Sequence, residues 1–164
     1  METIKMTSGN YFKSIKIIHL ALVTGVVFFA LISILLQAKG FGTVGQEIDN
    51  VLLIIVPIFV LAGIFASNFI FKKKLSEVRK KSNLKEKMEE YQSALIIKLA
   101  LIEAPSFFAV ISYLLTDNYI YLGLTAILII VFIIYAPNKT KFITDLELTK
   151  NESDLINNSE SEII

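Results

Sequence analysis

Residues 95–116 read LIIKLALIEAPSFFAVISYLLT, an apolar run that contains one glutamate and one proline. A helix needs about 20 apolar residues to cross the roughly 30 Å hydrocarbon core of a bilayer. This run is long enough to do so, and the chain contains further runs of the same character. We therefore predict four transmembrane helices, at about 15–36, 51–71, 95–115 and 119–135.

The composition favours a membrane protein over a soluble one. Of the 164 residues, 54% are hydrophobic, and they are gathered into these runs. The remaining polar chain is too short to cover four such helices in water. The first run follows lysines, as in a signal peptide, but it is longer than the roughly 7–15 residues of a signal-peptide core. We therefore predict an all-α integral membrane protein that retains its first span.

Lysine and arginine lie mostly on one side of the predicted spans, which predicts the orientation. Lys5, Lys13 and Lys16 precede the first span, and the loop 72–94 is strongly basic, whereas the opposite side has only Lys39. We expect both termini and this loop to be cytoplasmic. The frequent Lys, Ile and Asn suggest an AT-rich genome, and we predict location in a bacterial inner membrane.

The loop 72–94 is predicted to be partly helical. Asn83 can cap a helix that begins near Leu84, with Glu86 in the N3 position of a capping box. The basic residues before this helix could bind anionic lipid head groups, or they could simply enforce the topology. These residues are Lys72, Lys73, Lys74, Arg79, Lys80 and Lys81.

The segment 139–164 differs in composition from the bundle, which we place at 1–138. It carries three lysines and six acidic residues, and its hydrophobic periodicity is weak. Such a segment buries too little apolar surface to offset the entropy of ordering it. We predict a disordered, acidic cytoplasmic tail, which could also bind a partner.

The first and third predicted spans are similar to each other. Residues 17–36 and 96–115 align without a gap at an offset of 79, with twelve identities in twenty positions. The second and fourth spans match only weakly. We interpret the bundle as a duplicated helical hairpin whose two copies have the same orientation in the membrane, as in parallel-repeat transporters. At this offset Thr24 corresponds to Glu103, so one copy alone carries an acid.

Glu103 is the candidate functional residue because it lies about 12 Å inside the third span. An ionised carboxylate at that depth is costly, so the side chain should face the bundle interior and hold a proton. Pro105 frees the Leu101 carbonyl and can kink the helix. With the hydroxyls of Ser106 and Thr24, these groups would form a small proton- or ion-binding site. Alternatively, Glu103 is a neutral acid whose hydrogen bond fixes helix register.

Other polar and aromatic residues of the spans have less specific interpretations. His19 lies near the cytoplasmic end of the first span and could admit protons or simply lie at the interface. Lys98 is expected to extend toward that interface. Several aromatic residues fall near the predicted interfaces and are typical of membrane-belt anchors. These are Tyr11, Phe12, Tyr113, Tyr119, Tyr121 and Tyr135.

The segment LALIEAPSFFAVISYLL, residues 99–115, resembles the carboxylate-bearing helix of rotary-ATPase proteolipids, the c-type subunits. In that family a glutamate or aspartate lies mid-membrane, followed by a small residue and often a nearby proline. The resemblance covers about 20 of the 164 residues. The preceding span lacks the family's repeated small residues, and the loop 72–94 is longer than the family's. The resemblance implies that Glu103 carries a proton or a sodium ion.

Several functional classes are disfavoured by composition. The chain has no cysteine and one histidine, so we expect no thiolate or histidine metal site. No nucleotide fingerprint, nucleophile–base pair or other catalytic motif is present, so we expect neither an enzyme nor a bound cofactor. A net charge of +1 gives no field to attract nucleic acid. The expected partners are lipid and either further copies of the chain or other membrane subunits. The alternative function is that this chain is an accessory or scaffold subunit.

Overall fold

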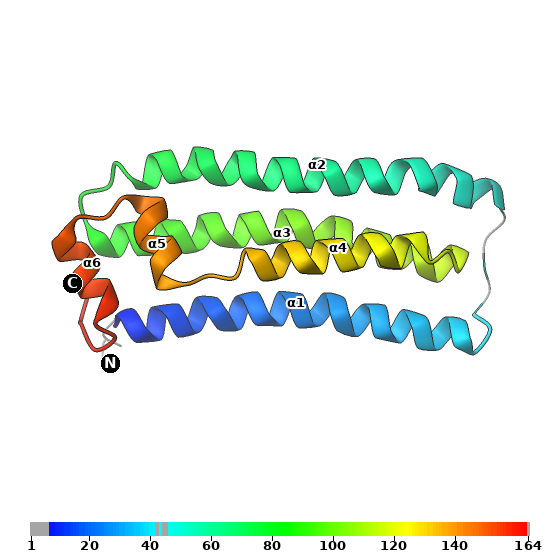
Figure 1. The fold of residues 1–164 in the computed structure, drawn as a ribbon, viewed down its shortest axis with the longest axis horizontal. Helices are drawn as coiled ribbons and strands as arrows, with labels where there is room; N and C mark the ends of the chain where they lie inside the picture. Colours follow the sequence, from blue (N-terminus) through cyan, green and yellow to red (C-terminus); the bar gives the residue numbers. More distant parts are fainter. Residues whose placement is uncertain (1–6, 42, 44–45, 164) are drawn as a thin grey trace, which may run out of the picture.

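The computed structural model describes residues 7–41, 43 and 46–163, so Lys5 lies outside it. Long helices dominate the described part of the chain, and the predicted all-α class is confirmed (Figure 1). The third helix begins at Leu84 behind the Asn83 N-cap, as expected. The helices are α1 Ser8–Ala38, α2 Gln46–Val78, α3 Leu84–Thr116, α4 Ile120–Ile134, α5 Lys139–Leu146 and α6 Lys150–Asn157.

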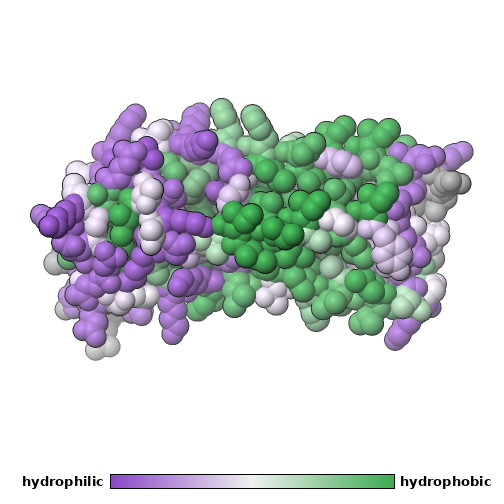
Figure 2. All heavy atoms as spheres, viewed as in Figure 1, coloured by the Kyte–Doolittle hydropathy of each residue, from purple (hydrophilic) through white to green (hydrophobic). Residues whose placement is uncertain are grey.

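Three of these helices, α1, α2 and α3, are long and apolar enough to cross a membrane. Helix α4 has 15 residues, which corresponds to about 22 Å and is shorter than the hydrocarbon core. A fourth span therefore requires α4 and α5 to be counted together, although they are bent by 77°. Pro137 follows the end of α4 and disfavours its continuation. Figure 2 shows the apolar band between two polar ends.

Helix α3 is the centre of the bundle and packs against α1, α2 and α4. Figure 1 shows α1 and α2 on opposite sides, with α3 and α4 between them. The chain direction alternates from one long helix to the next, so α1 and α3 run the same way. The buried stripe of α3 follows the helical period, because i, i+3, i+4 and i+7 share a face. Its apolar members include Leu95, Leu99, Ile102, Ala109 and Tyr113.

The segment after residue 138 is folded, which corrects the prediction of a disordered tail. Helices α5 and α6 cover one end of the bundle (Figure 1). Phe142, Leu146 and Ile156 are buried. The ring of Phe142 lies 4.8 Å from that of Tyr91. The apolar groups of the segment are few, but they are buried against aromatic side chains of α1 and α3, and that burial offsets the entropy of ordering.

The same docking corrects the interpretation of Tyr11 and Phe12 as membrane-belt anchors. Both side chains are buried, and both rings make edge contacts with Phe142. The hydroxyl of Tyr11 donates to the carbonyl of Met88 at 2.6 Å. Burial raises the pKa of Tyr11, so this hydroxyl remains a donor. The start of α1 therefore belongs to the core of the polar end and does not face lipid.

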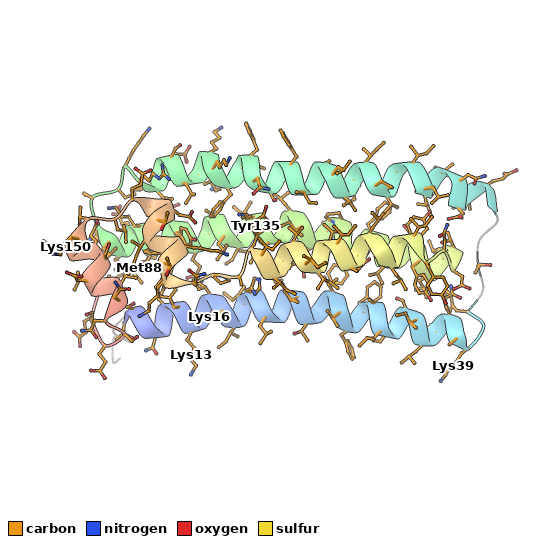
Figure 3. The ribbon with its side chains drawn as sticks, in the orientation of Figure 1. Lys13, Lys16, Lys39, Met88, Tyr135 and Lys150 are labelled. Atoms are coloured by element: carbon orange, nitrogen blue, oxygen red, sulfur yellow. The ribbon has the colours of Figure 1, made fainter. Side chains whose placement is uncertain are left out.

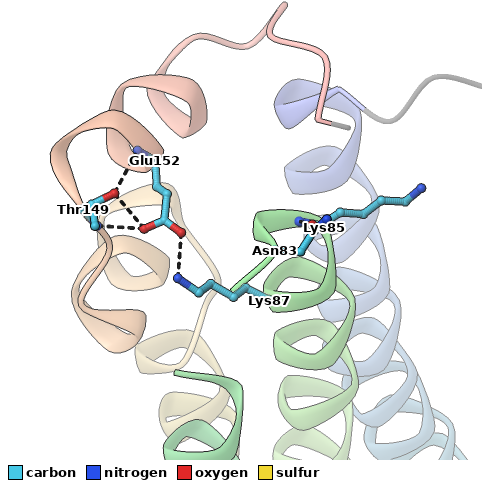
Figure 4. Close-up of polar contacts among 5 residues, drawn as sticks. All are labelled: Asn83, Lys85, Lys87, Thr149 and Glu152. Carbon is cyan, nitrogen blue, oxygen red and sulfur yellow. Dashed lines mark hydrogen bonds and ion pairs between the residues drawn. The ribbon is translucent and has the colours of Figure 1, made fainter. Parts of the chain in front are cut away.

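Ion pairs fasten α5 and α6 to the bundle. Lys87 of α3 lies 2.6 Å from Glu152 of α6, and Glu152 also accepts from Thr149 in a capping box (Figure 4). Arg79 pairs with Glu147 at 2.7 Å and is one of the predicted lipid-binding residues. The expected capping box at Asn83 is incomplete, because its side chain accepts from the Lys85 N–H while Glu86 pairs with Lys81.

The segment that follows α6 satisfies backbone donors at the start of α1. The first N–H groups of a helix have no partner within the helix. Here the Ser8 N–H donates to Ser161 O at 3.3 Å, and the Gly9 N–H donates to Ser159 O at 3.0 Å. The Ser8 hydroxyl donates to Ile156 O at 2.6 Å. The C-terminal segment thus caps the first helix of the chain.

Gly9→Ala is expected to loosen this cap. A Cβ at position 9 would lie 2.9 Å from Ser159 O, and overpacking of this kind costs about 1–3 kcal/mol. Amide exchange of residues 150–161 should therefore accelerate about tenfold, while that of α3 stays unchanged. Gly123→Ala is the matched control, because nothing lies within 4 Å of a Cβ there. Equal exchange in the two variants would contradict the prediction.

Candidate functional site

Glu103 lies in α3 one turn before Phe107, whose ring lies 5.6 Å from that of Phe29 on α1, and its neighbours Ile102 and Pro105 are buried. Its side chain is half-buried, and the neighbouring Ala100 and Ala104 are exposed. No described residue forms a hydrogen bond or an ion pair with the Glu103 carboxyl group. The half-buried acid therefore lies at the edge of the bundle, without a partner in the part of the chain that the structure describes, and not in the bundle interior as expected.

The predicted site of Glu103, Thr24 and Ser106 is not assembled by hydrogen bonds. Ser106 is buried, and its hydroxyl donates to the carbonyl of Ile102 at 2.8 Å. Thr24 is exposed on α1, whereas Val26 is buried. Two residues correspond to about 200° around a helix, so Thr24 points away from the face that Val26 presents to the bundle.

Pro105 lies at a close contact between α2 and α3, and α3 is continuous through it. Position 63 on α2 is glycine, and a Cβ there would lie 2.7 Å from Leu101 O and 2.7 Å from Pro105 Cγ. The carbonyl that Pro105 frees is therefore covered by the α2 backbone. It cannot take part in the polar site that the sequence predicted, and the glycine explains how two helices approach so closely.

A second polar cluster, which the sequence analysis did not find, surrounds Lys98. Its side chain is 8% exposed. The ammonium nitrogen lies 3.6 Å from the ring centroid of Tyr135 and 4.3 Å from that of Phe71. The Tyr135 hydroxyl donates to Asn68 at 2.9 Å. Lys98 is thus held by cation–π contacts with the residues that end two of the predicted spans, which is the level toward which it was expected to extend.

His19 belongs to the same level of the bundle. It is buried, and its Nε2 lies 2.9 Å from the carbonyl of Phe132. Because a carbonyl only accepts, this nitrogen must donate. Lys141 donates to Ala136 O at 3.1 Å. Cationic or donor groups thus gather at the C-terminal end of α4, where the helix dipole favours them. The sequence signal for this cluster was Pro137, because it ends α4 and so creates the helix C-terminus at which these groups gather.

Most of the predicted head-group residues are exposed near the end of α2. Lys72, Lys73, Arg79, Lys80 and Lys81 are exposed, and Lys74 is partly covered. Arg79 and Lys81 have acidic partners within the chain. Among the described residues, no group of three or more His, Cys, Asp or Glu side chains is placed to hold a metal ion.

Comparisons with known proteins give no identification. No protein-family model matches the chain, and no curated protein and no solved structure matches it. The functional argument therefore rests on the side chains described above.

Proposed function

We propose that the chain is a non-enzymatic membrane subunit that carries a proton or a small cation on Glu103. The observation behind this proposal is a carboxyl group in the apolar part of α3 that has no hydrogen-bond or ion-pair partner among the described residues. An acid at membrane depth is costly when ionised and is a functional candidate by default. The resemblance of residues 99–115 to proteolipid helices favours the same role.

We further propose that Glu103 works at a boundary with another copy of the chain or with another membrane subunit. The exposed Ala100 and Ala104 lie beside it on α3. Small residues allow a second helix to approach closely in a bilayer, and that helix could bring a donor to the acid. An oligomer would thereby supply the partner that Thr24 and Ser106 do not provide.

Infrared spectroscopy tests the carrier role. We expect the purified, reconstituted protein to show a protonated carboxyl band at neutral pH that is absent in Glu103→Gln. The band should weaken at alkaline pH or when sodium is added, because a carrier must release its proton. Glu89→Gln is the matched control, since Glu89 is an exposed acid on the same helix before the span. A band that neither pH nor sodium alters would contradict the carrier role and favour a structural hydrogen bond.

A duplicated hairpin is supported by burial as well as by sequence. His19 and Lys98 occupy equivalent positions in the repeat, and both are buried near the C-terminal end of α4. Ser33 and Ser112 are also equivalent. Each donates to the carbonyl four residues earlier, at 2.9 Å. We infer that α1 and α3 descend from one helix and present related faces to α4.

We infer that both termini and the end that carries α5 and α6 are cytoplasmic, because lysine and arginine concentrate there. The chain has no cysteine, so a single introduced thiol reports its own position. A membrane-impermeant maleimide added to intact cells should label Lys39→Cys and leave Lys73→Cys unlabelled. The reverse pattern would overturn the orientation.

The folded end of the molecule favours an accessory or scaffold subunit as the second candidate. Helices α5 and α6 present exposed charges of both signs, and their buried residues are packed against the bundle. In that case Glu103→Gln would leave ion movement in proteoliposomes unchanged, whereas removal of residues 139–163 would abolish assembly with the partner subunit.

A further inference from the structure

A basic groove lies between the first part of α1 and the folded tail, where the polar end of the molecule meets the apolar band. Its volume is about 400 Å³, and both α1 and the folded tail contribute to it. Figure 3 shows Lys13 and Lys16 near the start of α1, with Lys13 pointing away from the other helices. The residues that matter for the argument are Lys13, Lys16, Ile17, Leu20, Lys139 and Ser159.

The charge of the groove is positive. Three lysines line it, and no carboxylate is found among its described lining residues. Lys13 and Lys16 are exposed, lie one turn apart on α1 and have no ion-pair partner within the described chain. Lys139 is fixed in place, since its ammonium group donates to Asn157 O at 3.0 Å and to Ser159 Oγ at 2.9 Å. An anion would meet three ammonium groups here.

The apolar part of the groove continues toward the membrane. Ile17 and Leu20 are 57% and 64% exposed and follow Lys13 and Lys16 by about one turn on α1. Both fall within the apolar part of the first helix. The order of cations followed by an apolar surface is complementary to an anionic head group followed by an acyl chain.

We propose that this groove binds an anionic phospholipid, with its phosphate among Lys13, Lys16 and Lys139 and its acyl chain along Ile17 and Leu20. The site is distinct from the basic residues at the end of α2 and does not depend on what Glu103 carries. Because Lys139 and Ser159 belong to the tail, the lipid would bridge the tail to the first helix.

Native mass spectrometry of the full-length protein in detergent tests this site. We expect tighter binding of phosphatidylglycerol than of phosphatidylcholine with the same acyl chains. Lys13→Gln together with Lys16→Gln should weaken phosphatidylglycerol binding at least about tenfold, because each lysine near an anionic surface contributes roughly fivefold in affinity. The arginine double variant at these two positions should retain binding.

The matched control removes the same charge elsewhere at this end of the protein. Lys85 and Lys150 are exposed, lie outside the groove and are not among the predicted head-group residues, so Lys85→Gln with Lys150→Gln should change binding less than about twofold. Equal weakening by the two double variants would show diffuse attraction and overturn the site. Equal affinity for both lipids would also overturn it, as would displacement of the lipid by millimolar inorganic phosphate.

Discussion

Gly63→Ala is expected to destabilise the bundle, although the same change in an ordinary helix is stabilising by about 0.5–1 kcal/mol. A Cβ at position 63 would lie 2.7 Å from the backbone oxygen of Leu101 and 2.7 Å from Pro105 Cγ. A backbone oxygen cannot rotate away as a flexible side chain can, so α2 and α3 must separate. We expect a net loss of about 1–3 kcal/mol in the free energy of unfolding, measured by denaturant titration in mixed micelles.

Gly25→Ala is the control for this prediction. Gly25 also lies inside a long helix, and nothing is within 4 Å of a Cβ there. This variant should be neutral or slightly stabilised, because it gains helix propensity and meets no neighbour. If both variants shift the free energy of unfolding in the same direction, close packing at Gly63 is not what joins α2 to α3.

Glu152→Gln is expected to release α6 from the bundle. Lys87 and Glu152 are 2.6 Å apart, and their side chains are only 11% and 17% exposed. Removal of one partner leaves the other charge nearly buried and unpaired, which costs about 3 kcal/mol. Amide exchange in α6 should accelerate roughly a hundredfold. Glu86→Gln is the control, because its pair with Lys81 is 3.6 Å long and exposed and should contribute less than about 1 kcal/mol.

The same pair makes docking of α6 dependent on pH. Burial alone would raise the pKa of Glu152, but hydrogen bonds from Lys87 and Thr149 outweigh it and hold the pKa below its ordinary value. A lowered folded-state pKa stabilises the docked state above the unfolded pKa of about 4.3. That contribution is lost as the pH falls further, through the folded pKa. If acid accelerates amide exchange in α6 equally in the wild type and in Glu152→Gln, then Glu152 is not the group responsible for the pH dependence.

The long helices could be predicted from the sequence because their apolar runs exceed the thickness of a bilayer. The start of α3 could also be predicted, since Asn83 precedes a segment with helical hydrophobic periodicity. The fold of the tail could not be predicted, because α5 and α6 have eight residues each and two turns are too short to show a hydrophobic period. The Thr149-x-x-Glu152 capping box was nonetheless present as a local signal. Its docking depends on aromatic residues distant in the sequence.

The depth of Glu103 along its helix could be predicted, but the side of α3 on which it lies could not. Composition places Glu103 well inside an apolar helix, whichever way it faces. Its orientation follows from how α3 packs between three neighbours, and that information is distributed over many apolar residues. The same is true of Thr24, whose exposure depends on which side of α1 carries Val26. The contacts of Lys98 could not be predicted for a related reason, because its aromatic partners come from α2 and from the end of α4.

The cap at the start of α1 also sets an order of events during synthesis. Ser8 and its acceptor, the carbonyl of Ile156, are separated by 148 positions. At about 5–20 residues per second, a ribosome needs roughly 7–30 s to add that many. Helix α1 therefore reaches the membrane long before the tail can accept from the N–H groups of Ser8 and Gly9. During this interval its free N–H groups must be hydrated or bound by other molecules, and the nascent protein presents a surface that the finished protein conceals.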